Sequence, residues 1–200
     1  DIPAEVYWCG ECKTPIIQAV NQADKGICPI CGKQTKYMAA DLRPVFPEER
    51  LLLELLLGKK PHEFIDKSVW AANSRYYIEG KSVPISSKTF QLADATELIN
   101  QIYMYKDENS YEIFNKHISD FVFANKGRLN YLKDEAFGFV RNTASKFDEE
   151  RIVLSFSGGK DSTVTADVVT KALSNPCLVH IFGNTTLEFP STVDYAERYR

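Results

Sequence analysis

Apolar and polar residues follow one another along the C-terminal quarter of the chain in a pattern that predicts strand, helix, strand and helix. The apolar run at 152–156 ends in a turn signal and predicts a short buried strand. Residues 162–173 carry apolar side chains at helical spacing, residues 177–182 predict a second strand, and residues 190–200 predict the start of a second helix. Two strands joined by one helix predict a right-handed parallel crossover, with both carboxyl ends at the same edge of the sheet.

The middle of the chain carries weaker patterns. Residues 48–57 predict a short buried helix that ends at Gly58. An antiparallel meander is predicted by short apolar segments separated by turn residues, at 68–72, 75–78 and 81–85. Residues 130–146 have apolar positions at helical spacing, which predicts an amphipathic helix packed against the sheet as part of the core.

A run of polar residues separates the first C-terminal strand from its helix, and it has the composition of an anion-binding loop. Two glycines let the backbone turn tightly and approach a ligand, while the start of a helix presents unpaired N–H groups and a partial positive charge. Serine hydroxyls and a mobile lysine cation add further donors. The residues of the loop are Ser157, Gly158, Gly159, Lys160, Asp161 and Ser162. The alternative interpretation is a polar Gly-Gly turn without a ligand.

The loop is not the commoner phosphate loop, G-x-x-x-x-G-K-S/T, because Leu154 stands at its first glycine position and Asp161 at its hydroxyl position. It resembles instead the S-G-G-x-D-S signature of the PP-loop superfamily, the adenine-nucleotide alpha hydrolases. A second segment, from Asn184 to Thr192, resembles the N-T-x-x-E-F-P-x-T pattern of the phosphoadenosine phosphosulfate (PAPS) reductase branch. In that branch, an acidic residue often occupies the position of Asn184 in this chain. The resemblance covers residues 151–200.

The resemblance implies a fold, an activity and a set of site residues. The fold would be α/β, the start of a doubly wound parallel sheet of the PP-loop or Rossmann-like kind. The activity would be that of a PAPS reductase-like enzyme, a PP-loop ATP pyrophosphatase that binds ATP or an adenylyl sulfonucleotide and transfers or reduces a sulfur group. Catalytic roles fall on Lys160, which would neutralise phosphate charge, and on Asp161, which would orient the loop or a Mg²⁺ ion. Nucleotide contacts fall on the loop residues together with Asn184 and Glu188.

Two other functions compete with this one. Some PP-loop enzymes adenylate a nucleic-acid atom before thiolation, and the stretch at 59–88, which interleaves basic and aromatic residues, would then hold RNA or DNA. Such a stretch is more often an ordinary solvated face around core aromatics. The third function is a nucleotide-binding module without catalysis, which the intact loop argues against. The run Glu188-Phe189-Pro190 favours the reductase branch over the thiolation enzymes.

Two C-x-x-C pairs near the N-terminus predict a metal site, formed by Cys9, Cys12, Cys28 and Cys31. Their spacing is that of a four-thiolate zinc ribbon, and the zinc would be structural because four protein ligands leave no open position. Iron is the less common occupant. Two disulfides are the alternative, which we disfavour because nothing at the N-terminus resembles a signal peptide and a reducing cytoplasm keeps thiols free. The fifth cysteine, Cys177, is interpreted as a buried, inert thiol at the start of its strand.

Composition predicts a nearly neutral, soluble protein. The chain has 24 basic and 27 acidic residues, 44% of it is apolar, and no apolar run approaches the length of a membrane span. We therefore expect a cytoplasmic protein without a membrane partner. A doubly wound domain needs more residues than follow Glu150, so we expect the remainder of a longer chain to complete it and this piece alone to be inactive. The expected parts are a zinc ribbon at 1–41, a connecting α+β module at 42–125 and an incomplete PP-loop domain at 126–200.

Overall fold

The computed structural model describes residues 3–72, 75–86, 89, 93–107 and 109–199. The protein is a mixed α/β protein, and the chain divides into two compact units, Asp1–Arg128 and Leu129–Arg200. The expected boundary at residue 41 lies within the first unit, and the division into three parts stays a prediction. Within the described ranges, no helix has the length and apolar character needed to cross a membrane.

Two antiparallel sheets form most of the first unit. Their strands are β1 (Ala4–Cys9), β2 (Thr14–Ala19), β3 (Lys36–Ala39), β4 (Arg43–Pro44), β5 (Val69–Ala72), β6 (Arg75–Ile78) and β7 (Lys81–Val83). The N-terminal sheet has the order β2-β1-β3, and the second sheet has the order β4-β5-β6-β7. The predicted meander is confirmed, because β5, β6 and β7 pair in sequence order.

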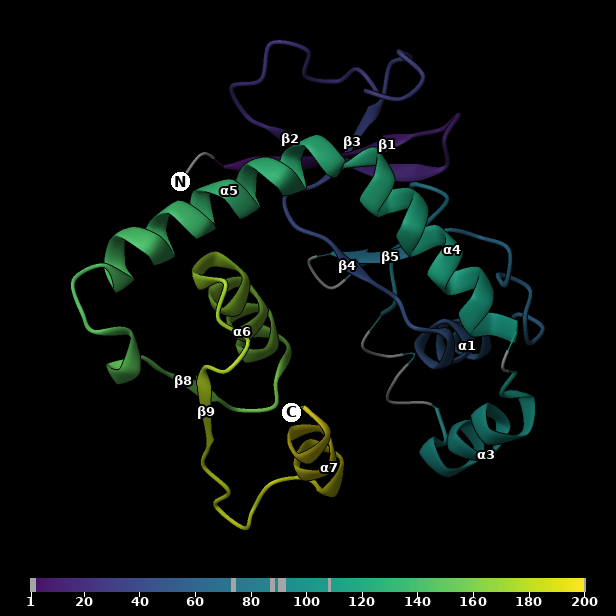
Figure 1. Ribbon diagram of the computed structural model, residues 1–200. Helices are drawn as coiled ribbons and strands as arrows, with labels where there is room; N and C mark the ends of the chain where they lie inside the picture. Colours follow the sequence, from purple (N-terminus) through teal and green to yellow (C-terminus); the bar gives the residue numbers. More distant parts are fainter. Residues whose placement is uncertain (1–2, 73–74, 87–88, 90–92, 108, 200) are drawn as a thin grey trace. The chain divides into compact units, whose positions relative to one another are not determined.

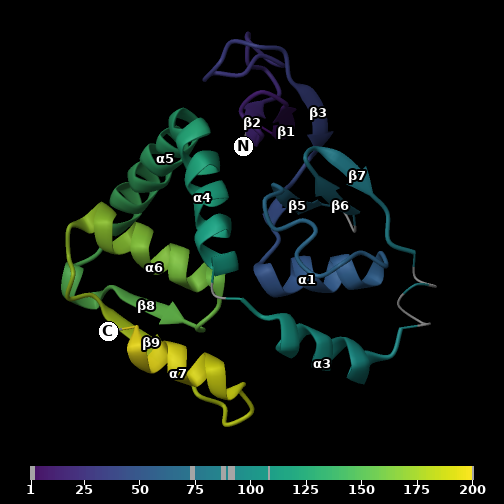
Figure 2. The ribbon, with the colours of Figure 1, turned by 90° about the vertical axis from the view of Figure 1, so that its right-hand side faces the viewer.

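The first unit also contains helices, and two of them, the first and the third in the list that follows, pack against its second sheet. They are α1 (Pro47–Leu56), α3 (Ala95–Tyr105), α4 (Asn109–Ala124) and the beginning of α5 (Lys126–Ala144). The helix predicted at 48–57 is confirmed by α1, and Gly58 follows it with a φ of 64°, a left-handed conformation common at helix ends. The apolar side of α1 lies against β5, where Leu53 packs with Val69 and Ala71 (Figure 2).

One hydrophobic core joins the two sheets of the first unit. Trp8 of β1 is 8% exposed and Trp70 of β5 is 2% exposed, and both belong to this core. The ring of Phe121 in α4 lies 4.8 Å from the ring of Trp70, measured between centroids. Glycine is required at position 80, because its φ is 73° and a Cβ there would lie 2.2 Å from Trp8 Cγ. The N-terminal sheet is therefore packed onto the rest of its unit by its own tryptophan.

The second unit contains the crossover that the sequence predicts. Its elements are β8 (Val153–Phe156), α6 (Lys160–Leu173), β9 (Val179–Phe182) and α7 (Pro190–Arg198), after a 3₁₀ turn at Glu149–Arg151. The two strands are parallel, with Phe156 paired with Phe182 at their carboxyl ends, and α6 connects them (Figure 1). Leu154 and Phe156 are buried against side chains of α6 and α7. A doubly wound sheet needs further strands and stays a prediction.

Two expectations about the C-terminal part are wrong. The helix predicted at 130–146 is confirmed as α5, which begins earlier, at Lys126, but its expected place in the core is wrong, because none of its residues is buried. Near its C-terminal end it contacts another helix, where Arg141 Nε donates to Ala172 O of α6 at 2.8 Å. Cys177 is exposed, not buried, because it lies in the turn before β9, where its N–H donates to Asn175 Oδ1 at 2.9 Å.

Candidate functional site

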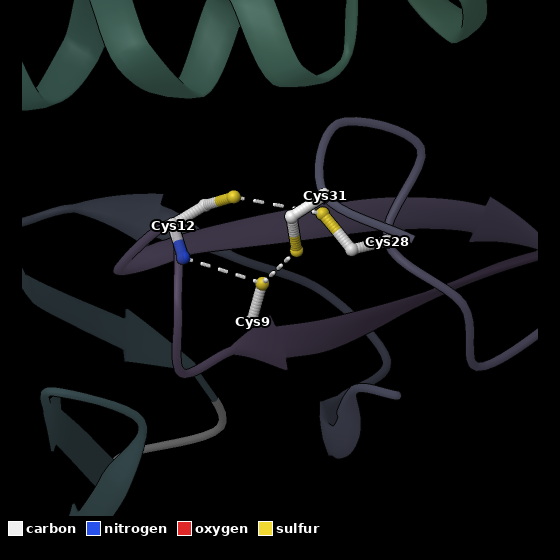
Figure 3. A group of neighbouring side chains, drawn as sticks. All are labelled: Cys9, Cys12, Cys28 and Cys31. Atoms are coloured by element: carbon white, nitrogen blue, oxygen red, sulfur yellow. Dashed lines mark hydrogen bonds between the residues drawn. The ribbon is translucent and has the colours of Figure 1, made fainter. Parts of the chain in front are cut away.

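The cysteines of the predicted ribbon lie in one cluster, and their four sulfur atoms are all within 4.8 Å of one another. Cys9 ends β1 and Cys12 lies in the turn that follows, while Cys28 and Cys31 belong to the loop before β3. Cys9 Sγ lies 3.6 Å from Cys31 Sγ, and Cys12 Sγ lies 3.8 Å from Cys28 Sγ. Figure 3 shows the four side chains turned toward a common centre.

These separations fit a tetrahedral metal site. Zinc holds a thiolate sulfur at about 2.3 Å, so two sulfurs of a tetrahedral zinc site lie about 3.8 Å apart. A disulfide bond is only about 2.0 Å long, and all the cysteines of the chain are free thiols. The geometry therefore disagrees with the alternative of two disulfides, and the cluster can hold a metal ion such as zinc.

Local electrostatics differ among the four thiols. The backbone N–H of Lys33 lowers the pKa of Cys31 to about 7, whereas burial raises the pKa of Cys9 and the pKa of Cys12. The backbone N–H of Cys12 also donates to Cys9 Sγ at 3.4 Å. Two thiols that resist ionisation need a nearby cation to become thiolates, and a divalent metal bound here would supply it.

A buried asparagine fixes the ribbon to helix α4, and no sequence pattern singles it out. Asn125 lies between α4 and α5 and is 2% exposed. Its Oδ1 accepts from Ile17 N at 2.6 Å, and its Nδ2 donates to Pro15 O at 2.9 Å. Both partners belong to β2, which is an edge strand of the N-terminal sheet. The neighbouring Ala124 packs in the same apolar cluster as the buried cysteines, so the end of α4 supports the metal site.

The two glycines of the predicted anion loop have different structural roles. Gly158 has a φ of 72°, and a Cβ at this position would lie 2.9 Å from Thr192 Cγ2 and 3.3 Å from Thr192 O. Gly159 is the N-cap of α6 with a φ of −86°, and a Cβ there would lie 3.5 Å from Ser157 Oγ, an ordinary contact. Gly158 is therefore needed for the turn itself, whereas Gly159 keeps side-chain atoms away from the start of the helix.

Hydrogen bonds within the loop converge on one carbonyl group. Gly159 O accepts from Thr163 N at 3.1 Å, from Thr163 Oγ1 at 2.9 Å and from Ser162 Oγ at 2.9 Å. Ser157 Oγ in turn donates to Ser162 Oγ at 3.1 Å. The N–H groups in the first turn of a helix have no partner within the helix. The loop can therefore offer an anion the amides that begin α6, where Lys160 and Asp161 also lie.

The second predicted loop follows β9 and begins at the same edge of the sheet as the first. Asn184 Oδ1 accepts from Thr186 N at 2.8 Å, and Thr185 Oγ1 donates to Glu188 Oε1 at 3.0 Å. These bonds hold Asn184 and Glu188 within their own loop. An open cavity of about 760 Å³ lies along β9 and includes Asn184 in its wall, next to the strand end that also carries the first loop.

Comparison with known proteins finds a family model that matches the C-terminal quarter of the chain. Residues 151–200 match the family model of the phosphoadenosine phosphosulfate reductase domain. The resemblance stated from the two loops is confirmed for this segment.

A curated relative matches a larger part of the chain. Over 93 residues the chain is 36% identical to the uncharacterized protein MJ0066 of Methanocaldococcus jannaschii. The match covers 46% of this chain and 19% of that protein, so the chain spans less than a fifth of its relative's length. No solved structure matches the chain significantly.

Proposed function

We propose that this chain is part of a PAPS reductase-family enzyme that binds ATP or an adenylyl sulfonucleotide and acts in sulfur transfer or reduction. The observation that carries the proposal is the two-glycine loop between β8 and α6, within a segment that matches the reductase domain. The start of α6 provides amide donors and a partial positive charge for a phosphate or sulfate group. The cavity along β9, whose wall includes Asn184, would receive the nucleoside.

Each site residue has a proposed role within this function. The amides of Gly158 and Gly159 and the side chain of Lys160 would bind and neutralise phosphate oxygens, which is stabilisation by preorganised donors. Asp161 would orient the loop or hold a Mg²⁺ ion, while Asn184 and Glu188 would contact the nucleotide from the second loop. The hydroxyls of Ser157 and Ser162 would turn from their bonds within the loop toward the anion.

A metal ion held by the four cysteines would have a structural role. We propose zinc as this ion, because four thiolates in a tetrahedral arrangement suit zinc and leave no coordination position for a substrate. Its position in the core of the first unit agrees with that role, since Cys9 and Cys28 are each 1% exposed.

The burial of two aromatic residues in the stretch at 59–88 argues against the thiolation alternative. Trp70 and Tyr77 of the basic stretch are 2% and 8% exposed, so their rings belong to the core and cannot stack on bases. Lys59 lies 2.9 Å from the carboxylate of Glu63 in an ion pair. Lys88, at the end of the stretch, lies outside the described residues. The described part of the stretch fits a solvated face around core aromatics.

Calorimetry on the zinc-loaded protein tests the proposal. ATP, adenosine phosphosulfate and PAPS would be titrated, with adenosine as the ligand that lacks an anion. At least one of the three anionic nucleotides should bind more tightly than adenosine, and Lys160→Ala should weaken that binding about tenfold or more, the size of one charged hydrogen bond. Lys146→Ala is the matched control, because Lys146 is an exposed lysine of the same unit and does not line the cavity along β9. If none of these nucleotides binds the folded wild-type protein, or if both variants bind alike, the proposal is wrong.

A further inference from the structure

A tyrosine of α7 is linked to the anion loop through a single hydroxyl group. Tyr195 OH lies 3.1 Å from Thr163 Oγ1, and Thr163 Oγ1 lies 2.9 Å from Gly159 O. Thr163 belongs to the first turn of α6, and Gly159 is the N-cap residue of that helix. The last helix of the unit therefore reaches the backbone of the loop, although the loop motif contains no residue of that helix.

These hydrogen bonds have one possible direction. Thr163 has a single hydroxyl proton, and the contact with Gly159 O uses it, because a carbonyl oxygen can only accept. Tyr195 must then donate to Thr163 Oγ1. Tyr195 thus donates to Thr163, and Thr163 donates to Gly159 O. In such a chain of hydrogen bonds, each bond polarises and strengthens the next.

This chain of bonds sets the orientation of one peptide group. The carbonyl of Gly159 and the N–H of Lys160 belong to the same planar trans peptide, so they point in opposite directions. Three donors hold the carbonyl toward α6, from Thr163 N, Thr163 Oγ1 and Ser162 Oγ. The N–H of Lys160 is thereby turned away from the body of the helix, to the side from which a helix N-terminus receives an anion.

Ring packing holds Tyr195 in position to do this. Its ring centroid lies 6.2 Å from that of Phe156, the last residue of β8. Tyr199, the C-cap residue of α7, stacks on the same ring at 4.5 Å with an interplanar angle of 16°. Thr192, three residues before Tyr195 and on the same side of the helix, lies directly beside Gly158. Helix α7 thus lies beside the loop at Gly158 and reaches Gly159 through Thr163.

We propose that Tyr195 is a positioning residue for nucleotide binding. Its hydroxyl acts through Thr163 to fix the Gly159–Lys160 peptide, so that the N–H of Lys160 meets an oxygen of the bound phosphate or sulfate. Tyr195 itself does not touch the ligand. The inference rests on the proposed function of the loop as a nucleotide site.

Two isosteric variants and their combination test this role. Tyr195→Phe keeps the ring and removes the hydroxyl, and Thr163→Val removes both hydroxyl contacts at nearly constant volume. Each should lower ATP affinity about three- to tenfold, as expected for one hydrogen bond, and the double variant should lose no more than Thr163→Val alone. Adenosine binding should not change. Thr163→Ser, which keeps the hydroxyl, should restore most of the affinity, and Tyr103→Phe at an exposed tyrosine of the first unit is the control.

A second measurement reports on the loop without any ligand. The ¹⁵N order parameter of the Lys160 amide should fall in Tyr195→Phe and stay unchanged in Tyr103→Phe, because the peptide loses its fixed orientation. Unchanged order parameters, equal losses of ATP and adenosine binding, or additive losses in the double variant would each overturn the role of Tyr195. If the wild-type protein binds no nucleotide, the proposed function fails by itself, and the order parameter alone decides whether Tyr195 fixes the loop.

Discussion

Replacing Asn125 with alanine should loosen the ribbon from the rest of its unit. The side chain makes three hydrogen bonds to main-chain groups, with Ile17 N, Pro15 O and Phe121 O, at 2.6, 2.9 and 2.8 Å. Alanine would leave the groups of β2 without partners in a site where Asn125 is 2% exposed. Each buried, unpaired main-chain group costs about 1–3 kcal/mol, so we expect the free energy of unfolding to fall by roughly 2–4 kcal/mol. For an m-value of about 2 kcal/mol per M of urea, this corresponds to an unfolding midpoint that is lower by roughly 1–2 M urea.

Tryptophan fluorescence during urea unfolding measures this effect selectively. Both tryptophans of the chain, Trp8 and Trp70, lie in the core of the first unit, and Trp70 packs against Phe121 of α4. Asn115→Ala, at an exposed asparagine of the same helix, is the control and should change the stability by less than about 0.5 kcal/mol.

A further variant separates the donor role of Asn125 from its acceptor role. Asn125→Asp keeps the acceptor for Ile17 N but places a carboxylate against Pro15 O and Phe121 O, so it should destabilise at least as much as alanine. If Asn125→Ala unfolds at the same urea concentration as Asn115→Ala, the asparagine does not hold the ribbon in place and the reasoning fails.

The metal, the glycines and the basic stretch give further expectations. Elemental analysis should find about one zinc per chain. Chelation should unfold the ribbon, which tryptophan emission would report, while the second unit stays folded. The absence of metal, or two disulfides detected by mass spectrometry, would refute the metal site. Gly158→Ala should lower the stability of the second unit by about 1–2 kcal/mol from its positive φ alone and weaken nucleotide binding. Gly159→Ala, at an N-cap with a negative φ, should cost less, about 0.5 kcal/mol; equal thermal shifts would contradict the assigned turn. Binding to RNA or DNA should be weak, and Arg75→Ala should not alter its salt dependence; a flattening of the log–log slope by about 0.7 would support the thiolation enzyme instead.

The parts of the fold and site that could be predicted have local signals. Two C-x-x-C pairs must keep their spacing for four sulfurs to meet, so the cluster of Cys9, Cys12, Cys28 and Cys31 could be expected from the sequence. The turn between β8 and α6 has a similar local signal, because a strand, two glycines and a helix follow one another within a few residues, while its role as an anion site stays a prediction. The parallel pairing of β8 and β9 follows from the same segment, since a strand–helix–strand unit has one favoured handedness.

The features that could not be predicted depend on residues far apart in the chain. Asn125 is polar and lies between two helices, a context typical of an exposed residue, and its partner Ile17 is 108 positions away. The apolar spacing of α5 predicts a helix correctly but does not identify what the helix packs against. Cys177 precedes an apolar strand, so the sequence suggests a buried thiol. The thiol is exposed because Cys177 lies in a turn, where its N–H donates to Asn175 Oδ1.

Helix α7 shows why an apolar pattern can identify a core position and still miss its function. Tyr195 and Tyr199 lie four residues apart, so both rings face the core and pack near Phe156, which is all that helical periodicity requires. Phenylalanine would satisfy that periodicity equally well. The hydroxyl of Tyr195 has no effect on the pattern, yet it is the atom that contacts Thr163 and, through it, Gly159 O. A loop that binds anions through its amides is encoded partly by its glycines and partly by whatever fixes its peptide planes. At this site we infer that the second contribution comes from a side chain outside the motif.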